Sequence, residues 1–406
     1  MPFNISEIFS LYWIAVILGI LTAFSTTWFI IPSIVHTSRL KNLGAASNGR
    51  TSHKDTIPNL GGIAVYAGFV ISAVIFAGKL IGSELVYIIC GLTIVLFLGI
   101  KDDILVVNPW KKLAGQIIAT SIIVVLPDIR IENFYGLFGI TQIPYIVSVL
   151  FTVFVLLLII NGFNLIDGID GLASGIGILT SSVFGIWFWM TGNNDYTVLS
   201  FSFCGSLMAF FYFNVFSSKN KLFLGDTGSL ITGFVLGILA CRFLQLDMKV
   251  TGDSYIRSAP AVLFGVLIIP LFDTLRVFVI RLAQGKSPFK ADRQHMHHRL
   301  LQLGITHLQA SLILISVNMV VISLCYVLQG IGIIRLTILI LGLASLMSYI
   351  LFIASKKKSL VPIYSEYVVE GTWTRKIRKR STGRIRHINN ITLHYPEKAT
   401  VDTDKN

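Results

Sequence analysis

The sequence predicts an all-α polytopic membrane protein with about 10–11 transmembrane helices. Two observations lead to this fold class. Of the 406 residues, 54% are hydrophobic and only 13% are charged. The apolar residues also occur in runs of about 17 to 24, and a helix of that length crosses a hydrocarbon core of about 30 Å. Most of the chain is therefore expected to lie within a bilayer.

The expected helices follow one another with short connections. Those near 85 and 113 are short for a span, so they are expected to tilt little or to begin among the lipid headgroups. The pattern predicts a transmembrane domain over residues 1–354 and a basic cytoplasmic C-terminal tail over residues 355–406. The expected spans are 11–32, 60–80, 85–100, 113–127, 143–160, 172–190, 198–216, 229–244, 259–280, 309–329 and 332–354.

Lysine and arginine residues set the expected orientation. With the N-terminus outside, the inner segments hold roughly 26 of these residues and the outer segments about 4. The C-terminus is then cytoplasmic, and the protein is expected in the cell (inner) membrane as a multi-pass protein. The formal net charge of +13 accordingly belongs to a face beside anionic lipid, and no nucleic-acid partner is expected.

The unusual polar clusters all fall on the inner side under this topology. Each has a plainer explanation: the paired aspartates could be a solvated helix end, and "GDTGS" could be a helix cap. However, ionisable and amide groups this close to a membrane core are costly, so their presence favours function. Several such clusters on one face predict a single active site on the cytoplasmic side. The clusters are "NGRTSHKDTIPNLGG" (48–62), "KDDILVVNPWKK" (101–112), "NGFNLIDGIDG" (161–171), "SSKNKLFLGDTGS" (217–229) and "KADRQHMHHRLLQLG" (290–304).

The residue types in these clusters suit phosphate chemistry. Carboxylate and amide oxygens are ligands for Mg²⁺, for which Mn²⁺ can substitute, and the cations suit phosphates. The sequence contains neither GxxxxGK[ST] nor GxGxxG, so neither an ATPase nor a dinucleotide site is expected. Grooves between apolar spans suit a lipid chain, which favours phosphoryl transfer to a lipid phosphate. The candidates are Asp102, Asp103, Asp167, Asp170, Asp226, Asn161, Asn164, Asn214, Lys54, Lys111, Lys112, Arg293, His295, His297, His298 and Arg299.

Four motifs in this order resemble the polyprenyl-phosphate N-acetylhexosamine-1-phosphate transferase family. They are "DD" after the third span, NxxNxxDGxDGL at 161–172, "FLGDTGS" at 223–229 and HxHHR at 295–299. The resemblance covers roughly residues 11–354. It implies transfer of N-acetylglucosamine 1-phosphate from a UDP-sugar donor to undecaprenyl phosphate with release of UMP, the first membrane step of cell-envelope glycan synthesis.

The resemblance also implies roles for individual residues. Asp226 and Asn164 would bind Mg²⁺. Asp102 and Asp103 would lie at the lipid phosphate, and Asp102 would deprotonate or orient it. Asp170 would face the uracil, with Phe223 stacking on the ring. Asn161 would shape the loop. Lys112 and Lys54 would hold phosphates, Arg293, His295, His297, His298 and Arg299 would grip the diphosphate or sugar, and Asp167 and Asn214 would complete the substrate-binding set.

Several alternatives stay open. Related enzymes that act on the muramoyl-pentapeptide precursor share the aspartate motifs, although "HMHHRL" fits the N-acetylglucosamine branch better than a denser "HHH" would. Another UDP-N-acetylhexosamine donor also fits. A single displacement is preferred over a covalent aspartyl intermediate. A homodimer is left open. From other classes, a secondary transporter would place its polar residues near the midplane, and an intramembrane aspartyl protease would need a second acid in a matching context.

Overall fold

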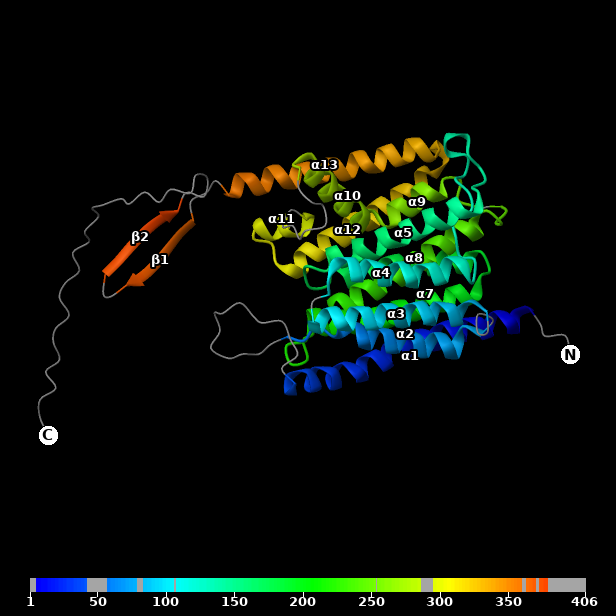
Figure 1. Cartoon of the computed structure of the whole chain (residues 1–406), viewed down its shortest axis with the longest axis horizontal. Helices are drawn as coiled ribbons and strands as arrows, with labels where there is room; N and C mark the ends of the chain where they lie inside the picture. Colours follow the sequence, from blue (N-terminus) through cyan, green and yellow to red (C-terminus); the bar gives the residue numbers. More distant parts are fainter. Residues whose placement is uncertain are drawn as a thin grey trace, which may run out of the picture. The chain divides into compact units, whose positions relative to one another are not determined.

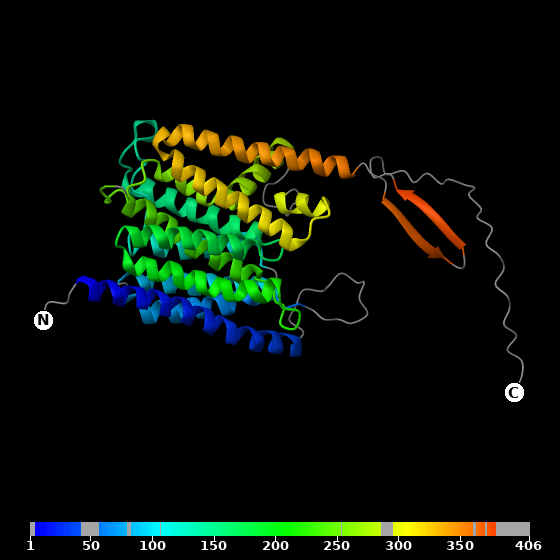
Figure 2. The ribbon, with the colours of Figure 1, turned by 180° about the vertical axis from the view of Figure 1, so that it is seen from behind.

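The computed structural model describes residues 5–41, 57–78, 83–105, 107–252, 254–285, 295–359, 363–369 and 372–378. Its contacts divide the chain into two units, Met1–Leu351 and Phe352–Asn406. Helices make up almost all of the first unit (Figures 1 and 2), which confirms the predicted all-α membrane fold. They are α1 (Ile5–Leu40), α2 (Gly61–Phe76), α3 (Glu84–Leu105), α4 (Pro109–Val125), α5 (Tyr145–Ile166), α6 (Leu172–Met190), α7 (Asn194–Val215), α8 (Gly225–Asp247), α9 (Ala259–Val266), α10 (Ile268–Ala283), α11 (Met296–Gln302), α12 (His307–Leu328) and α13 (Ile333–Ser359).

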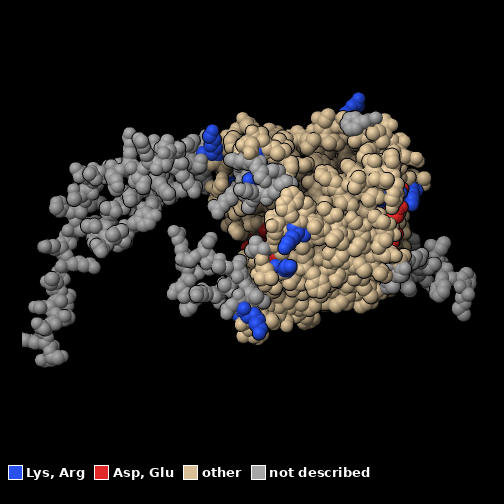
Figure 3. All heavy atoms as spheres, viewed as in Figure 1, with Lys and Arg blue, Asp and Glu red and all other residues tan. Residues whose placement is uncertain are grey.

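Each expected span has a helix at its position, but fewer of these helices are long enough to cross a bilayer. Within the described ranges, 8 helices qualify by length and composition, or up to 9 if the bent pair α9 and α10 forms one span. The difference from the predicted 10–11 arises because α2 and α4 have only 16 and 17 residues. On the face in Figure 3, the charged side chains that are drawn lie toward the ends of the helices, with a broad uncharged surface between them.

Helix α8 lies at the centre of the first unit. It packs against α2, α3, α5 and α6, and 89% of the residues in its apolar stretch are buried. Two glycines let neighbouring backbones approach its first turn. A Cβ atom at Gly99 of α3 would lie 2.3 Å from the Thr227 Cα, and one at Gly62 of α2 would lie 2.2 Å from the Gly228 backbone nitrogen. The start of α8 is thus held between α2 and α3.

The prediction of one continuous helix over 259–280 is wrong, because the helix is broken in two. Helices α9 and α10 meet at an angle of 83° around Leu267. Pro270 explains the break: its ring clashes with the carbonyl four residues earlier, on Val266, and it lacks an N–H group. That freed carbonyl accepts a hydrogen bond from the buried Asn318 Nδ2 of α12 at 3.1 Å. The Asn318 side chain therefore gives a hydrogen-bond partner to the carbonyl that the break leaves without one.

The opposite ends of α3, α7 and α8 are joined by a partly buried polar network. Arg242 of α8 pairs with Glu84 at the start of α3, and its Nε donates to the Tyr196 hydroxyl of α7 at 2.8 Å. Gln245 of α8 donates to Glu132 at 2.5 Å. These contacts fix the helix ends that lie away from the predicted active site.

The described residues of the second unit are the end of α13 and an antiparallel pair of strands, β1 (Ile363–Val369) and β2 (Thr372–Arg378). In their register, Ile363 lies opposite Arg378 and Val369 lies opposite Thr372. The sequence did not predict this hairpin, which lies within the segment expected to be a basic tail.

Candidate active site

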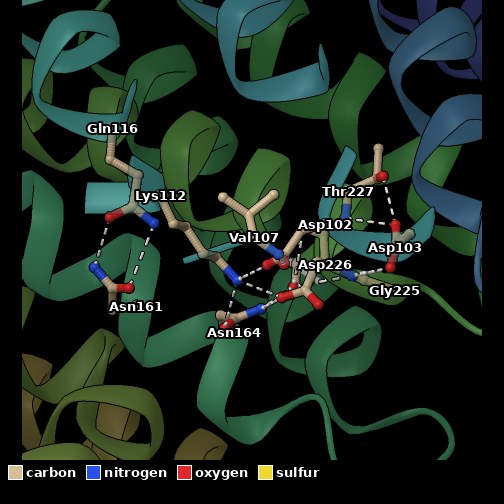
Figure 4. Close-up of polar contacts among 11 residues, drawn as sticks. Asp102, Asp103, Val107, Lys112, Gln116, Asn161, Asn164, Gly225, Asp226 and Thr227 are labelled. Atoms are coloured by element: carbon tan, nitrogen blue, oxygen red, sulfur yellow. Dashed lines mark hydrogen bonds and ion pairs between the residues drawn. The ribbon is translucent and has the colours of Figure 1, made fainter. Parts of the chain in front are cut away.

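Lys112 lies at the centre of a compact polar group (Figure 4). Helix α4 begins after Asn108, which caps it, and presents Lys112 from its first turn. The Lys112 Nζ lies 2.7 Å from Asp102 Oδ2, 2.5 Å from Asp226 Oδ1 and 3.4 Å from Asn164 Oδ1. Its side chain is only 15% exposed, so these oxygens supply most of its solvation. Four of the residues predicted for the site therefore meet at one ammonium group.

Asp226 and Asn164 are also joined directly. The Asn164 Nδ2 donates to Asp226 Oδ1 at 2.6 Å and to the Ser229 hydroxyl at 2.9 Å. Asn164 is on α5, and Asp226 and Ser229 are in the first turns of α8. Asp226 is the more open of these groups, with 34% of its side chain exposed. An incoming ligand therefore has access to this carboxylate.

The two adjacent aspartates of α3 point in different directions (Figure 4). Asp102 accepts from the Val107 backbone N–H at 2.6 Å and pairs with Lys112. Asp103 instead accepts from the backbone N–H groups of Asp226 and Thr227 at 2.8 and 3.0 Å, and from the Thr227 hydroxyl at 2.5 Å. Only Asp102 belongs to the group around Lys112.

An amide pair that the sequence did not predict lies one helical turn from this group. Asn161 Nδ2 donates to Gln116 Oε1 at 2.9 Å, and Gln116 Nε2 donates back to Asn161 Oδ1 at 3.4 Å. Gln116 is fully buried. It follows Lys112 by four residues, so both lie on the same face of α4. An amide inside an otherwise apolar helix was the only signal that could have identified it.

A second cluster surrounds Asp170, in the connection between α5 and α6. The Lys221 Nζ lies 2.7 Å from Asp170 Oδ2, and His307 Nδ1 lies 3.6 Å from the same oxygen. Lys221 is also 6.0 Å from the centre of the Phe223 ring. Neither Lys221 nor His307 was a predicted site residue, because each is a single charged or titratable residue near a helix end.

Asn214 connects the two segments of this cluster. Its Oδ1 accepts from the Gly171 backbone N–H at 2.7 Å, and its Nδ2 donates to the Leu222 carbonyl at 3.0 Å. The side chain is buried and both of its ends are engaged with backbone. The predicted substrate-binding residue Asn214 therefore lies beneath the cluster and fixes the residues next to Asp170 and Phe223.

The histidine segment docks on α10. His295 Nδ1 lies 2.9 Å from Asp273 Oδ2, and Arg276 donates to the other oxygen of Asp273 at 2.7 Å. The Met296 backbone N–H also points at this carboxylate. His295 and Arg299 are buried, whereas His298 is only partly buried. Asp273 thus anchors the start of α11.

His297 is enclosed between this segment and the loop that carries Asp167. It is 1% exposed, and a Cβ atom at Gly168 would lie 2.3 Å from its Nε2. Its ring lies 4.2 Å from that of His298, measured between centroids. Burial, with the nearby charge of His298, lowers the pKa of His297 to about 3. His297 is therefore neutral at physiological pH and packs the histidine segment against the loop.

Asp167 ends α5 and lies between the two clusters. Desolvation, together with the negative charges of Asp226, Asp103 and Asp170, raises the pKa of Asp167 well above its usual range.

The predicted residues Lys54 and Arg293 lie outside the described residues.

The oxygen atoms around Lys112 fit a magnesium ion. Oxygens of Asp226, Asn164 and Asp102 already converge on one positive charge, and Mg²⁺ prefers such hard ligands. In the part of the chain that the structure describes, no group of three or more His, Cys, Asp or Glu residues could hold a metal. With only Asp226 and Asn164 as protein ligands, an ion here would complete its shell with water and substrate phosphates, as Mg²⁺ does.

Comparison with known proteins matches the part of the chain that carries this group. The model of glycosyl transferase family 4 matches residues 85–244, which include Asp102, Lys112, Asn164, Asp170 and Asp226. The decaprenyl-phosphate N-acetylglucosaminephosphotransferase of Mycolicibacterium smegmatis is 31% identical over 323 residues, which are 73% of this chain and 76% of the relative.

Relatives from other bacteria match a similar region. The corresponding decaprenyl-phosphate enzyme of Mycobacterium leprae is 29% identical over 72% of this chain and 79% of its own length. The undecaprenyl-phosphate α-N-acetylglucosaminyl 1-phosphate transferase of Escherichia coli K12 is 27% identical over 65% of this chain and 70% of its own length. The chain therefore belongs to glycosyl transferase family 4, among the polyprenyl-phosphate N-acetylhexosamine-1-phosphate transferases, and it is a membrane-embedded glycosyl-1-phosphate transferase.

Proposed function

We propose that the protein transfers N-acetylglucosamine 1-phosphate from UDP-N-acetylglucosamine to undecaprenyl phosphate on the cytoplasmic face of the membrane. The observation that carries this proposal is the convergence of Asp102, Asn164 and Asp226 on Lys112. An ammonium group and a set of hard oxygens at one point suit a reaction in which two phosphates must be brought together despite their negative charge. The named activities of the relatives support the same reaction.

The proposed reaction is a single displacement. An oxygen of the lipid phosphate attacks the phosphorus that bears the sugar, and the bond from that phosphorus to the UMP oxygen breaks. UMP leaves with the electron pair of that bond, and the product is a lipid-linked diphosphate sugar. The lipid phosphate is already anionic, so it needs little activation, and no covalent enzyme intermediate is required.

The residues around Lys112 divide the work of this step. Asp226 and Asn164 would hold Mg²⁺, which supplies neutralisation of the donor phosphates when it is bound. Lys112 stabilises the charge that develops on the transferring phosphoryl oxygens. Asp102, through its ion pair, holds Lys112 in place and orients the acceptor phosphate. The buried Gln116–Asn161 pair keeps α4 and α5 in register beneath these groups.

The cluster at Asp170 is the proposed binding site for the base of the donor. The carboxylate of Asp170, held by Lys221, can accept a hydrogen bond from an imide N–H, and the face of Phe223 can stack on a flat ring. On the other side of the loop, the partly buried His298 is the proposed contact to the diphosphate or sugar, whereas His295 and Arg299 are buried and His295 is held by Asp273. His297 is not assigned this role, because it is enclosed and neutral.

The proposal is tested with the purified full-length protein in detergent. Undecaprenyl phosphate, Mg²⁺ and one UDP-sugar at a time are supplied, and UMP and the lipid product are followed by mass spectrometry. We expect release of UMP with UDP-N-acetylglucosamine that requires both lipid and metal and is lost in Asp226→Asn. Release of UMP with UDP-N-acetylmuramoyl-pentapeptide, and not with UDP-N-acetylglucosamine, would overturn the proposed identity of the donor. Folded protein that is silent with every donor would overturn the reaction.

A further inference from the structure

The start of α8 is held by a side chain from another helix. Both carboxylate oxygens of Asp103, in the last turn of α3, accept hydrogen bonds from the first turn of α8. The donors are the backbone N–H groups of Asp226 and Thr227 and the Thr227 hydroxyl, at 2.8, 3.0 and 2.5 Å. Thr227 is fully buried. A helix leaves its first N–H groups without partners inside the helix, and Asp103 satisfies two of them from outside.

The backbone that leads into α8 is fixed on its other side as well. The Phe223 N–H donates to the Pro58 carbonyl at 2.8 Å, and the N–H groups of Gly61 and Gly62 donate to the carbonyls of Phe223 and Leu224 at 3.0 and 3.1 Å. Gly225 has a positive φ of 72°, and a Cβ atom there would lie 1.9 Å from the Asn59 carbonyl oxygen. The same Cβ atom would lie 2.7 and 2.8 Å from the two carboxylate oxygens of Asp103, so the residue before Asp226 is packed against both the Asn59 carbonyl and Asp103.

These contacts engage both carboxylate oxygens of Asp103 with the first turn of α8. We propose that Asp103 and Thr227 are positioning residues, which set the direction of the Asp226 carboxylate, and that Asp103 does not touch the acceptor phosphate. The two adjacent aspartates of α3 then have different functions: Asp102 acts at the reacting phosphates through Lys112, and Asp103 acts only through α8. This assignment replaces the role at the lipid phosphate expected for Asp103, and it rests on the proposed role of Asp226 as a ligand for the metal.

The chain offers matched variants for a test. Thr227→Val removes the hydroxyl that donates to Asp103 and keeps the shape of the side chain, and Thr227→Ser restores the hydroxyl. Thr232→Val is the control, because Thr232 is equally buried on α8 but donates to the Gly228 carbonyl of its own helix at 2.7 Å. Mn²⁺ binding to each full-length protein in detergent is measured by electron paramagnetic resonance, without substrates. The KM for undecaprenyl phosphate and kcat are measured on the same samples.

We expect Thr227→Val to weaken Mn²⁺ binding by about tenfold, the size that loss of one hydrogen bond to a charged group predicts. We expect kcat to fall with it and the KM for undecaprenyl phosphate to stay unchanged. Thr227→Ser and Thr232→Val should bind Mn²⁺ as the wild type does. Asp103→Asn should show the same pattern as Thr227→Val, and the two changes together should cost less than the product of their separate effects, since they remove one shared contact.

A rise in the KM for undecaprenyl phosphate in Asp103→Asn, with unchanged Mn²⁺ binding, would overturn the inference and return Asp103 to the acceptor. Unaltered Mn²⁺ binding and kcat in a folded Thr227→Val would overturn it too. Thermal unfolding of each variant separates a folding defect from a change at the site. If the proposed function itself is wrong, the wild-type protein would neither turn over substrate nor bind Mn²⁺. The inference about Asp103 would then be overturned as well.

Discussion

Lys112 connects the acidic groups of the site through a single ammonium group. It is mostly enclosed, and its bonds to Asp102 and Asp226 are short. In an environment with little water, such a charge acts strongly on nearby phosphates. The same side chain also prevents two carboxylates from facing each other unscreened. Loss of Lys112 should therefore damage both the resting site and the transfer step.

Lys112→Met is expected to lower kcat by about 10²–10³, the cost of removing one preorganised group that stabilises developing charge. Lys111→Met is the matched control, because Lys111 is the adjacent residue on the same turn and is exposed. Initial rates of UMP release measure both variants. A Lys112→Met protein that keeps more than about a tenth of the wild-type rate would contradict the assignment of this residue to the transfer step.

Lys221→Met is expected to raise the KM for the UDP-sugar by roughly tenfold, with a smaller change in kcat. Lys221 holds the carboxylate of Asp170 at 2.7 Å, so its loss leaves the proposed base site without its fixed acceptor. Lys219→Met, two residues earlier and exposed, serves as the control. Donor saturation curves give both constants. An unchanged donor KM together with a large fall in kcat would place Lys221 at the reacting phosphates and not at the base.

Asp167 makes stability depend on pH in a defined direction. Its folded-state pKa is raised above the ordinary value of 3.8, so the fold favours the protonated form. The stabilisation is complete below that ordinary value and is lost as pH rises toward the raised pKa. Asp167→Asn, which cannot ionise, should therefore gain thermal stability relative to the wild type as pH rises from about 4 to neutral. A difference in melting temperature that stays constant over this range would show that Asp167 is not desolvated in the fold.

The sequence predicted the acids that the structure brings together, but it did not distinguish the surroundings of Asp102 from those of Asp103. "DD" offers two equal candidates, and only the path of α8 shows that Asp102 faces Lys112 while Asp103 faces a helix terminus. His297 lies in a segment that reads as cationic, yet its enclosure keeps it neutral. Gln116 and Lys221 have no motif around them. Their contacts depend on which helices become neighbours, and local sequence does not determine that.

At the scale of elements, the site depends on helix ends that extend beyond their apolar runs. Helix α3 continues to Leu105 and α5 to Ile166, so Asp102, Asp103, Asn161 and Asn164 are on rigid helices. The sequence placed these residues in clusters after the spans, because hydropathy falls before the helix ends. Functional groups on helices are held more closely in place than groups on loops. This is why the register between α4 and α5 matters for Lys112.

The break between α9 and α10 was not predicted, although its cause is visible in the sequence. Pro270 is inside an apolar run, and a proline there can either kink a helix or break it. The outcome depends on a partner for the freed carbonyl, which Asn318 of α12 provides. The break turns α10, and with it Asp273, toward the histidine segment. A polar residue within one apolar span thus supports a bend in another.

Asn318→Leu is expected to destabilise the protein by about 1–3 kcal/mol, because the Val266 carbonyl would be left buried without a partner. Ser323→Ala on the same helix is the control, since the Ser323 hydroxyl bonds only to the Met319 carbonyl of its own helix. Thermal unfolding in one detergent compares the variants. Equal melting temperatures for Asn318→Leu and the wild type would mean that the break does not need this hydrogen bond.

At the scale of the whole first unit, the two ends of the helix bundle carry different polar groups. One end gathers the acids, amides and cations around Lys112 and Asp170, and the other end holds the network of Glu84, Tyr196 and Arg242. Tight packing of α8 against α2 and α3 connects the two ends. A central helix that is fixed at both ends provides a rigid frame for the proposed site, where two phosphates would be held in line.

Much of this arrangement could be predicted from the sequence. Apolar runs placed the helices, and the restriction of polar clusters to alternate connections predicted that they meet on one face. Every expected span has a helix, and the short span expected near 113 is the 17-residue α4, but the sequence did not indicate that α2 has only 16 residues. Which helices pack against one another could not be predicted either. Every span is apolar on most of its surface, so the sequence contains no signal for the neighbours of a given helix.

The measurement that tests the account most directly follows the phosphorus that is transferred. Full-length protein, undecaprenyl phosphate and Mg²⁺ are mixed with UDP-N-acetylglucosamine labelled with ³²P at the phosphate next to the sugar. The account predicts that the label passes to the lipid product while unlabelled UMP is released, that no label stays on the protein, and that Asp226→Asn and Lys112→Met stop the transfer. Label that remains on the nucleotide, or that accumulates covalently on an aspartate of the enzyme, would contradict direct transfer at the site around Lys112.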